Sequence, residues 1–309
     1  MTLPTFVIGG APKSGTTALW GMLREHPDVF MTAFKEPHFF TREVSEPAPG
    51  VRIVGRPRPD SYARGMDWYE SLFEGGEGRA ARGEASTHYL CARDAPELME
   101  RHVPGLRIIF VLRQPVDRAY SHYWHYRKNG HRLPPFEAIL DDDPQLRYLD
   151  YVSRYAEHLQ RYREAFGPER VYVATFDDFR ADPARTYREV CRFIGVDDSF
   201  HAEYHREYNP HGKPASSLVH GLLRRTKRMR WTFLPAGLRH RARDVRGRLD
   251  LLNLRRTAYP ELAPDVWRRM TELFEPDIRY VEELLHPLPA WREQRVPHRP
   301  AAEGVAAGG

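Results

Sequence analysis

A lysine and three hydroxyl side chains are crowded into the turn that follows the first apolar stretch of this chain of 309 residues. The apolar stretch, Phe6 to Ile8, predicts a short buried strand, and the glycines after it permit a tight turn. We expect a helix to begin near Thr16 and to run to about His26, where Pro27 ends it. Open N–H groups at the start of a helix bind anions. The residues that this pattern places around a phosphate are Lys13, Ser14, Gly15, Thr16 and Thr17.

This loop differs from the usual ATP- or GTP-binding loop. In the pattern G-x-x-x-x-G-K-[ST] the lysine directly follows the second glycine, but here Thr16 follows Gly15 and the lysine is Lys13. In nucleotide triphosphatases an acid at the end of a second strand usually helps to hold magnesium. The clearest second strand ends at Leu112 and is followed by Arg113, a cation. A magnesium triphosphate is therefore a poor fit.

Arg113 and Ser121 instead suggest a second anion site. An arginine at the carboxyl end of a parallel strand, with a serine two turns into the next helix, can hold a phosphate. Two anion sites at one edge of a sheet fit a nucleotide that carries phosphates at both its 5′ and 3′ positions. The pattern contains no metal ligand at this edge.

Buried strands alternate with helices along most of the chain. Continuous apolar runs predict parallel strands, and amphipathic stretches predict helices between them. This alternation predicts an α/β fold of three layers, in which helices flank a parallel sheet. The expected strands are Arg107–Leu112 and Val171–Thr175, and the expected helices are Ala95–His102, Val116–Lys128, Tyr151–Phe166, Pro183–Ile194 and Leu262–Leu285.

Three motifs resemble those of sulfotransferases that use 3′-phosphoadenylyl sulfate (PAPS), in the family that includes the heparan sulfate N- and O-sulfotransferases. The run Lys13–Thr17 is similar to the loop that binds the 5′-phosphosulfate, and Leu112–Ser121 is similar to the 3′-phosphate motif. Glu36–Phe40 is similar to the segment that carries the catalytic base. The resemblance spans most of residues 5–285. It implies a P-loop-NTPase-like fold, PAPS as sulfuryl donor, adenosine 3′,5′-bisphosphate (PAP) as product, and no metal.

An in-line attack of the acceptor's hydroxyl or amine on sulfur suggests roles for single residues. Glu36 would be the base, Lys13 would stabilise charge on the leaving oxygen, and His38 would orient the acceptor or replace Glu36 as the base. Glu84 and His88 lie in a segment that can line the acceptor side. The late basic loop that covers the nucleotide in the family corresponds to Gly212–Ser217, which supplies Lys213, Ser216 and Ser217.

One departure from the family concerns residue 85. Heparan-type enzymes commonly have Glu-Lys-Ser/Thr where this chain has Glu84, Ala85 and Ser86. The missing lysine would help to hold the sulfonate or an anionic acceptor, so a highly charged glycan acceptor is less firmly implied than the reaction. The family's paired cysteines near the late basic loop are also absent.

Composition limits the cellular setting. No apolar run approaches the roughly 20 residues of a membrane span, and the first strand begins too early to leave room for a signal peptide. Cys91 and Cys191 are the only cysteines and lie far apart. We therefore expect a cytoplasmic protein without a disulfide framework, with one domain over residues 1–290 and a tail over residues 291–309. The oligomeric state stays open.

The net charge of +5 is unevenly distributed. Residues 224–248 contain ten Lys or Arg and one acid, Asp244. Such a run is either a solvated helix face or a basic surface for an anionic or lipid-linked acceptor at a membrane. We expect no nucleic-acid partner.

Two other functions remain open from the residues alone. A magnesium-dependent small-molecule kinase shares the loop but needs a carboxylate for its metal. A non-catalytic nucleotide-binding or basic interaction protein needs no base at Glu36. Within the sulfotransferase interpretation the acceptor is a hydroxyl or amine of a small molecule or glycan: a carbohydrate, a glycolipid or a natural product. Residues 44–61 and 224–248 are expected to shape its pocket.

Overall fold

The computed structural model describes residues 2–42, 50, 61–204, 213–214, 254–255 and 259–294. Contacts divide the chain into two units. The larger unit comprises Met1–Tyr208 and Leu262–Gln294, and the smaller comprises Asn209–Glu261 and Arg295–Gly309. In the smaller unit the described residues include an antiparallel pair, β6 (Lys213–Pro214) and β7 (Leu254–Arg255). All other elements described below belong to the larger unit.

The centre of the larger unit is a five-stranded sheet in the order β2-β3-β1-β4-β5. Every neighbouring pair in this sheet is parallel. Because β1 lies between β3 and β4, the loops that follow these three strands meet at one edge of the sheet. The strands are β1 (Phe6–Gly10), β2 (Val29–Met31), β3 (Ala81–Ala85), β4 (Arg107–Leu112) and β5 (Val171–Thr175).

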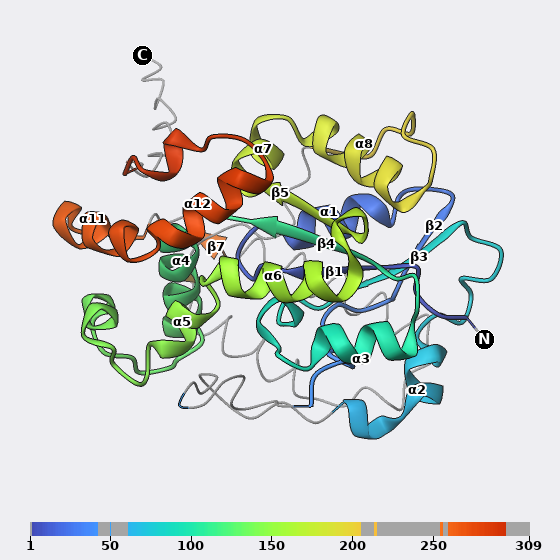
Figure 1. Cartoon of the computed structure of the whole chain (residues 1–309), viewed down its shortest axis with the longest axis horizontal. Helices are drawn as coiled ribbons and strands as arrows, with labels where there is room; N and C mark the ends of the chain where they lie inside the picture. Colours follow the sequence, from blue (N-terminus) through green and yellow to red (C-terminus); the bar gives the residue numbers. More distant parts are fainter. Residues whose placement is uncertain are drawn as a thin grey trace, which may run out of the picture. The chain divides into compact units, whose positions relative to one another are not determined.

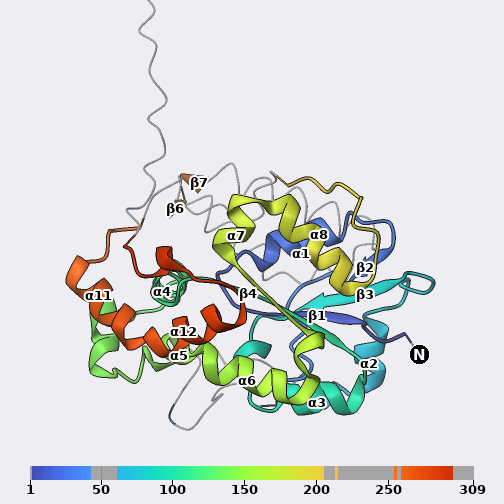
Figure 2. The same ribbon diagram turned by 45° about the horizontal axis from the view of Figure 1, so that its top comes forward.

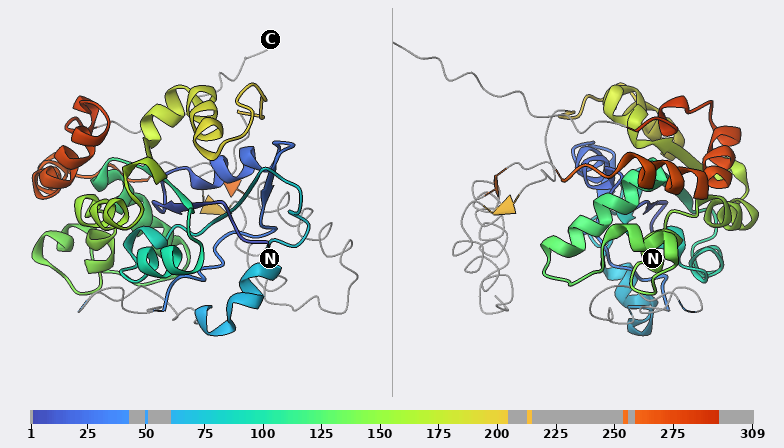
Figure 3. Two further views of the ribbon diagram at one scale, coloured as in Figure 1. Left: turned by 45° about the vertical axis from the view of Figure 1, so that its right-hand side comes forward. Right: turned by 90° about the vertical axis from the view of Figure 1, so that its left-hand side faces the viewer.

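Helices cover both faces of the sheet, as Figures 1 and 2 show, and Figure 3 gives two further views. One face packs against α1 (Thr16–Leu23), α7 (Phe176–Ala181) and α8 (Pro183–Ile194). The other face packs against α3 (Ala95–His102), α6 (Tyr155–Phe166) and α12 (Glu275–Leu284). The predicted three-layer α/β fold is confirmed.

Alternation along the strands builds a core on each face. In β4, Ile109 and Val111 pack on the α1 side, whereas Ile108, Phe110 and Leu112 pack on the α6 side. Successive side chains of a strand point to opposite faces, so a continuous apolar run is what a strand covered on both sides requires.

A third apolar cluster joins helices next to the sheet. It contains residues of α4 (Pro115–Lys128), α5 (Arg147–Tyr151) and α11 (Pro264–Leu273). Along the sequence, the short helix α2 (Met66–Ser71) comes between β2 and β3. Single 3₁₀ turns are formed by Tyr62–Arg64, Tyr89–Cys91, Phe136–Asp141, Pro168–Arg170 and Pro289–Trp291.

Side-chain caps fix the helices that follow the central strands. Gln114 accepts a hydrogen bond from the Asp117 N–H at 2.7 Å, so α4 begins directly after β4. Asp182 accepts from the Arg185 N–H at 2.9 Å at the start of α8, and Gly195 ends α8 in a left-handed conformation.

Three expected helices have different limits in the structure. The helix predicted over Leu262–Leu285 is two helices, α11 and α12, because Pro276 cannot continue the hydrogen-bond ladder. The stretch Tyr151–Phe166 contains the end of α5 and then α6, and α1 ends at Leu23 rather than near His26.

The packed chain extends a little beyond residue 290. Trp291 is 1% exposed, and its indole N–H donates to Asp177 at 2.7 Å. Arg292 forms ion pairs with Glu275 and Glu282 of α12. No helix in the part of the chain that the structure describes is long and apolar enough to cross a bilayer.

Candidate functional site

The loop between β1 and α1 has the geometry of an anion site. Lys13 (φ 72°) and Gly15 (φ 85°) both have left-handed backbone conformations, and no side chain among the described residues caps α1. A Cβ atom at residue 15 would lie 2.9 Å from the ring of Phe176, so this position needs glycine for space as well as for conformation. The first N–H groups of α1 therefore stay open to a ligand.

Lys13 lies among other cations. Burial, together with the nearby positive charges of Arg113 and Lys128, lowers the pKa of Lys13 to about 8. Within the described part of the chain, no carboxylate forms an ion pair with Lys13. A bound anion would relieve both the desolvation and the repulsion.

Arg113 joins the same edge from the end of β4. Its Nη1 donates to the Lys13 carbonyl at 3.5 Å, and its guanidinium lies 5.4 Å from the ring centre of Phe176. Asp117 is 3.9 Å from Nη2, so this carboxylate neutralises Arg113 only partly. The predicted meeting of the two basic motifs is present in the structure.

Two serine hydroxyls of these motifs are buried and have no hydrogen-bond partner among the described residues. They are Ser14 (0% exposed) and Ser121 (2% exposed). A buried hydroxyl without a partner is costly, by about 1–3 kcal/mol. Phosphate oxygens would satisfy both groups.

The second arginine of the 3′-phosphate-like motif has a structural position. Arg118 is fully buried and donates to the Ser153 hydroxyl at 2.8 Å and to the Leu149 carbonyl at 2.5 Å. It therefore ties α4 to α5, behind the edge where Arg113 lies.

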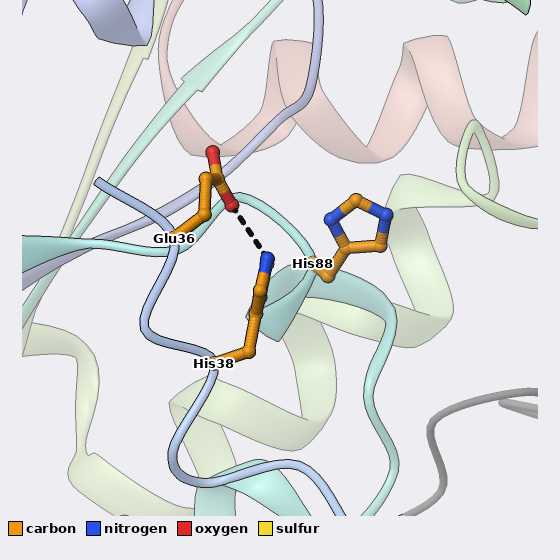
Figure 4. Close-up of side chains that lie close together, drawn as sticks. All are labelled: Glu36, His38 and His88. Carbon is orange, nitrogen blue, oxygen red and sulfur yellow. Dashed lines mark ion pairs between the residues drawn. The ribbon is translucent and has the colours of Figure 1, made fainter. Parts of the chain in front are cut away.

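The loop after β2 brings Glu36 and His38 together (Figure 4). Glu36 Oε2 lies 3.1 Å from His38 Nε2 and accepts a hydrogen bond from the Thr87 N–H at 3.0 Å. The Thr87 hydroxyl donates to Oε1 at 3.1 Å. Both Glu36 (φ 64°) and His38 (φ 53°) have left-handed backbone, which is rare for residues with side chains.

The charge state of Glu36 is set by opposing effects. Burial raises its pKa, but the hydrogen bond from His38 and the positive charges of His38, His88 and Lys35 outweigh burial and lower the pKa to about 2. The side chain of Glu36 is 32% exposed and that of His38 is 11% exposed. Glu36 is thus an ionised carboxylate that is partly exposed to solvent.

Glu84 supports this loop from behind. It has no exposed surface, and burial raises its pKa to about 8. Its Oε2 accepts from the Ser86 hydroxyl at 2.8 Å, and Ser86 Oγ accepts from the His38 N–H at 3.0 Å. Tyr69 donates to Oε1 at 3.4 Å. Because Glu84 is sealed from solvent, it positions His38 through Ser86 instead of contacting an acceptor as the sequence suggested.

His88 lies on the other side of His38. Its ring meets the His38 ring edge-on at 5.0 Å and stacks on Tyr148 at 5.9 Å. Ligand atoms of Glu36, His38 and His88 lie within 4.8 Å of one another. Two imidazoles and a carboxylate are a donor set that zinc accepts, but Lys35 beside Glu36 adds a positive charge that opposes a cation here.

The sequence analysis assigned no role to Lys35. Its Nζ donates to the Thr17 hydroxyl at 2.9 Å and to the Thr16 hydroxyl at 3.4 Å, so Lys35 reaches the start of α1. Thr87 was also missed as the residue that holds the Glu36 carboxylate. The sequence signal that could have identified Lys35 was its position directly before the motif residue Glu36.

Other predicted residues fall in the smaller unit or outside the described chain. Lys213 forms part of β6. Ser216, Ser217 and the basic stretch 224–248 lie outside the described residues, as does most of the stretch 44–61.

Comparisons with known proteins agree on one kind of domain. The model of the sulfotransferase domain family matches residues 3–210. The chain is 31% identical over 214 residues to the human bifunctional heparan sulfate N-deacetylase/N-sulfotransferase 3, covering 63% of this chain and 22% of that protein. It is 29% identical over 204 residues to the mouse heparan sulfate glucosamine 3-O-sulfotransferase 3B1, covering 63% of this chain and 46% of that protein.

The chain thus spans less than half the length of these two relatives. A solved structure matches over more of the chain. The crystal structure of a sulfotransferase from Alicyclobacillus acidocaldarius has a TM-score of 0.67 and 28% identity, over 95% of this chain and 100% of that chain.

Proposed function

The chain belongs to the sulfotransferase domain family, and we propose that it moves a sulfuryl group from PAPS to a hydroxyl or amine of an acceptor. The parallel sheet with its flanking helices is the P-loop-NTPase-like fold of that family. The observation that carries the proposal is the contact between Arg113 and the Lys13 loop at the carboxyl edge of β1 and β4, together with the buried hydroxyls of Ser14 and Ser121, which have no hydrogen-bond partner among the described residues.

The residues present fit a nucleotide with two separate phosphates. Ser14, Lys13 and the start of α1 would hold the 5′-phosphosulfate, and Arg113 with Ser121 would hold the 3′-phosphate. The strand end that would hold magnesium in a kinase carries Arg113 instead of an acid. These features favour PAPS over a magnesium triphosphate.

The donor supplies a sulfur atom whose bond to a phosphate oxygen breaks as a new bond to the acceptor oxygen or nitrogen forms. Lys13 would stabilise the negative charge that stays on the phosphate oxygen of PAP. Glu36, ionised and within reach of solvent, would take the proton from the acceptor. His38 would hold Glu36 in place and exchange that proton at Nε2, 3.1 Å away.

The acceptor is proposed only as a class of molecule. The relatives named above are heparan sulfate enzymes, which supports a glycan acceptor. His88, close to His38 and mostly buried, would contact the acceptor beside the reacting group. A carbohydrate, a glycolipid and a natural product all offer the hydroxyl or amine that the reaction needs.

Calorimetric binding of PAP without magnesium tests the donor site. We expect micromolar affinity, about −8 kcal/mol, and at least about tenfold weaker binding in Arg113→Ala because a charge-assisted contact is lost. Arg107→Ala is the matched control, since Arg107 begins the same strand at its opposite end, and its affinity should equal that of the wild type.

Turnover of Glu36→Gln tests the base. With PAPS and a panel of carbohydrate and phenolic acceptors, we expect the rate to fall by about 10²- to 10⁴-fold while PAP binding stays unchanged. Binding of ATP with magnesium in place of PAP would overturn the proposal and favour a kinase.

A further inference from the structure

The ammonium group of Lys35 lies at the start of α1, next to the loop that would hold the donor's 5′-phosphosulfate. Its Nζ donates to the hydroxyls of Thr17 and Thr16, which begin α1. These hydroxyls belong to the loop that would hold the 5′-phosphosulfate. Lys35 directly precedes Glu36, so one short segment brings a cation to the donor and a carboxylate to the acceptor.

The backbone around Lys35 places it next to residue 85. The Glu36 N–H donates to the Ala85 carbonyl at 2.8 Å, which joins the loop after β2 to the end of β3. Ala85 is fully buried in the core on the α1 side of the sheet, with Ile8 and Leu19. A longer side chain at residue 85 would therefore extend on the side where Lys35 reaches α1.

The charge of Lys35 is only partly balanced by the protein. Burial lowers its pKa, and the negative charges of Glu36 and Glu84 oppose that effect. Glu84 is largely protonated at neutral pH because burial raises its pKa to about 8, and Glu36 already pairs with His38. An anion next to Thr17 would complete the balance.

We propose that Lys35 binds the sulfonyl oxygens of the donor and stands in for the lysine that this chain lacks at residue 85. The inference rests on the proposed function. In the transfer, the S–O bond to the 5′-phosphate breaks and its electron pair stays on PAP, while the acceptor oxygen or nitrogen bonds to sulfur and its proton passes to Glu36. Lys35 holds the sulfonyl oxygens on this path and directs the sulfur toward Glu36.

Comparing PAP with PAPS isolates the sulfonyl contact, because PAP lacks the sulfonate. In Lys35→Ala we expect PAP to bind within about twofold of the wild type, PAPS to bind at least about tenfold more weakly, and kcat to fall by about 10²-fold. Arg64→Ala removes one positive charge from an exposed residue that stacks on Trp68 at 3.7 Å, so it should change none of these values. Equal weakening of PAP and PAPS in Lys35→Ala would show that Lys35 only supports the loop, and would overturn the inference.

A relocated lysine provides the second test. In the double variant Lys35→Ala/Ala85→Lys we expect at least about tenfold recovery of kcat over Lys35→Ala, and circular dichroism and PAP affinity report whether the variant folds. If the double variant does not fold, Lys35→Arg replaces it. Arginine keeps the charge and should retain at least about tenfold more PAPS turnover than Lys35→Ala. A folded charged variant no better than Lys35→Ala would overturn the inference. Failure of the proposed function looks different, because the wild type itself would then bind no PAP.

Discussion

Replacing Glu84 by glutamine should remove a pH-dependent cost that the site imposes on the fold. Glu84 is fully buried, and burial raises its pKa from 4.5 to about 8. Between these values the folded protein keeps a proton that the unfolded chain has lost. The stability of the folded state therefore falls as the pH rises through this window. A glutamine side chain resembles the protonated acid and does not titrate.

The size of the effect follows from the width of that window. Each unit of pKa shift corresponds to about 1.4 kcal/mol. At pH 7 the wild type would have lost roughly 3 kcal/mol relative to its stability below pH 4.5, where the carboxyl is protonated in both states. Glutamine can still accept from the Tyr69 or Ser86 hydroxyl, so Glu84→Gln should gain stability relative to the wild type as the pH rises.

Urea unfolding at pH 5, 6 and 7.5 measures the difference in unfolding free energy between Glu84→Gln and the wild type. We expect this difference to change by roughly 3 kcal/mol across the series, in favour of the variant. Glu97→Gln is the matched control, because Glu97 is exposed and forms its ion pair with Arg101 of the same helix, α3. A difference for Glu84→Gln that stays constant with pH would refute the argument, since Glu84 would then titrate alike in both states.

Two further predictions concern the cations of the site. Because the pKa of Lys13 is about 8 in the free protein, PAP affinity should be constant below pH 8 and fall by up to about tenfold per pH unit above it. Calorimetry at pH 7, 8 and 9 measures the affinity, and an unchanged affinity at pH 9 would contradict the prediction. Arg118→Met should lower the unfolding free energy by about 2–4 kcal/mol, since it removes the buried hydrogen bonds that Arg118 donates to the Leu149 carbonyl and the Ser153 hydroxyl. PAP affinity of the folded Arg118→Met protein should match the wild type, and a loss as large as in Arg113→Ala would place Arg118 at the nucleotide.

Strands and helices that are marked by an unbroken apolar run or a regular amphipathic pattern could be predicted from the sequence. The strands Arg107–Leu112 and Val171–Thr175 and the helix Ala95–His102 have the predicted limits. A strand covered on both faces must be apolar throughout, and such a run is visible in a single sequence. Helix ends were harder to predict where tertiary contacts decide them, as at the break before α6, where Ser153 and Arg118 hold the chain.

The meeting of the two basic motifs could also be predicted, because parallel strands bring their carboxyl ends to one edge. The strand order could not. It is the position of β3 beside β2 that places Ser86, Thr87 and His88 next to Glu36 and His38. No local pattern in the sequence states which strands are neighbours, and the role of Thr87 and the burial of Glu84 depend on that pairing.

The backbone conformation of the site suggests that its residue types serve function and not stability. Lys13, Glu36 and His38 all have left-handed conformations, which cost about 1 kcal/mol or more for residues with a Cβ atom. Glycine would relieve that strain at each position but would remove the side chain. Hydrogen bonds to residues after β3 stabilise these conformations: the Thr87 N–H donates to the Glu36 carboxylate, and the His38 N–H donates to the Ser86 hydroxyl. A loop selected for stability alone would have glycine at these positions, so the strained side chains are best explained by what they bind and where a proton must go.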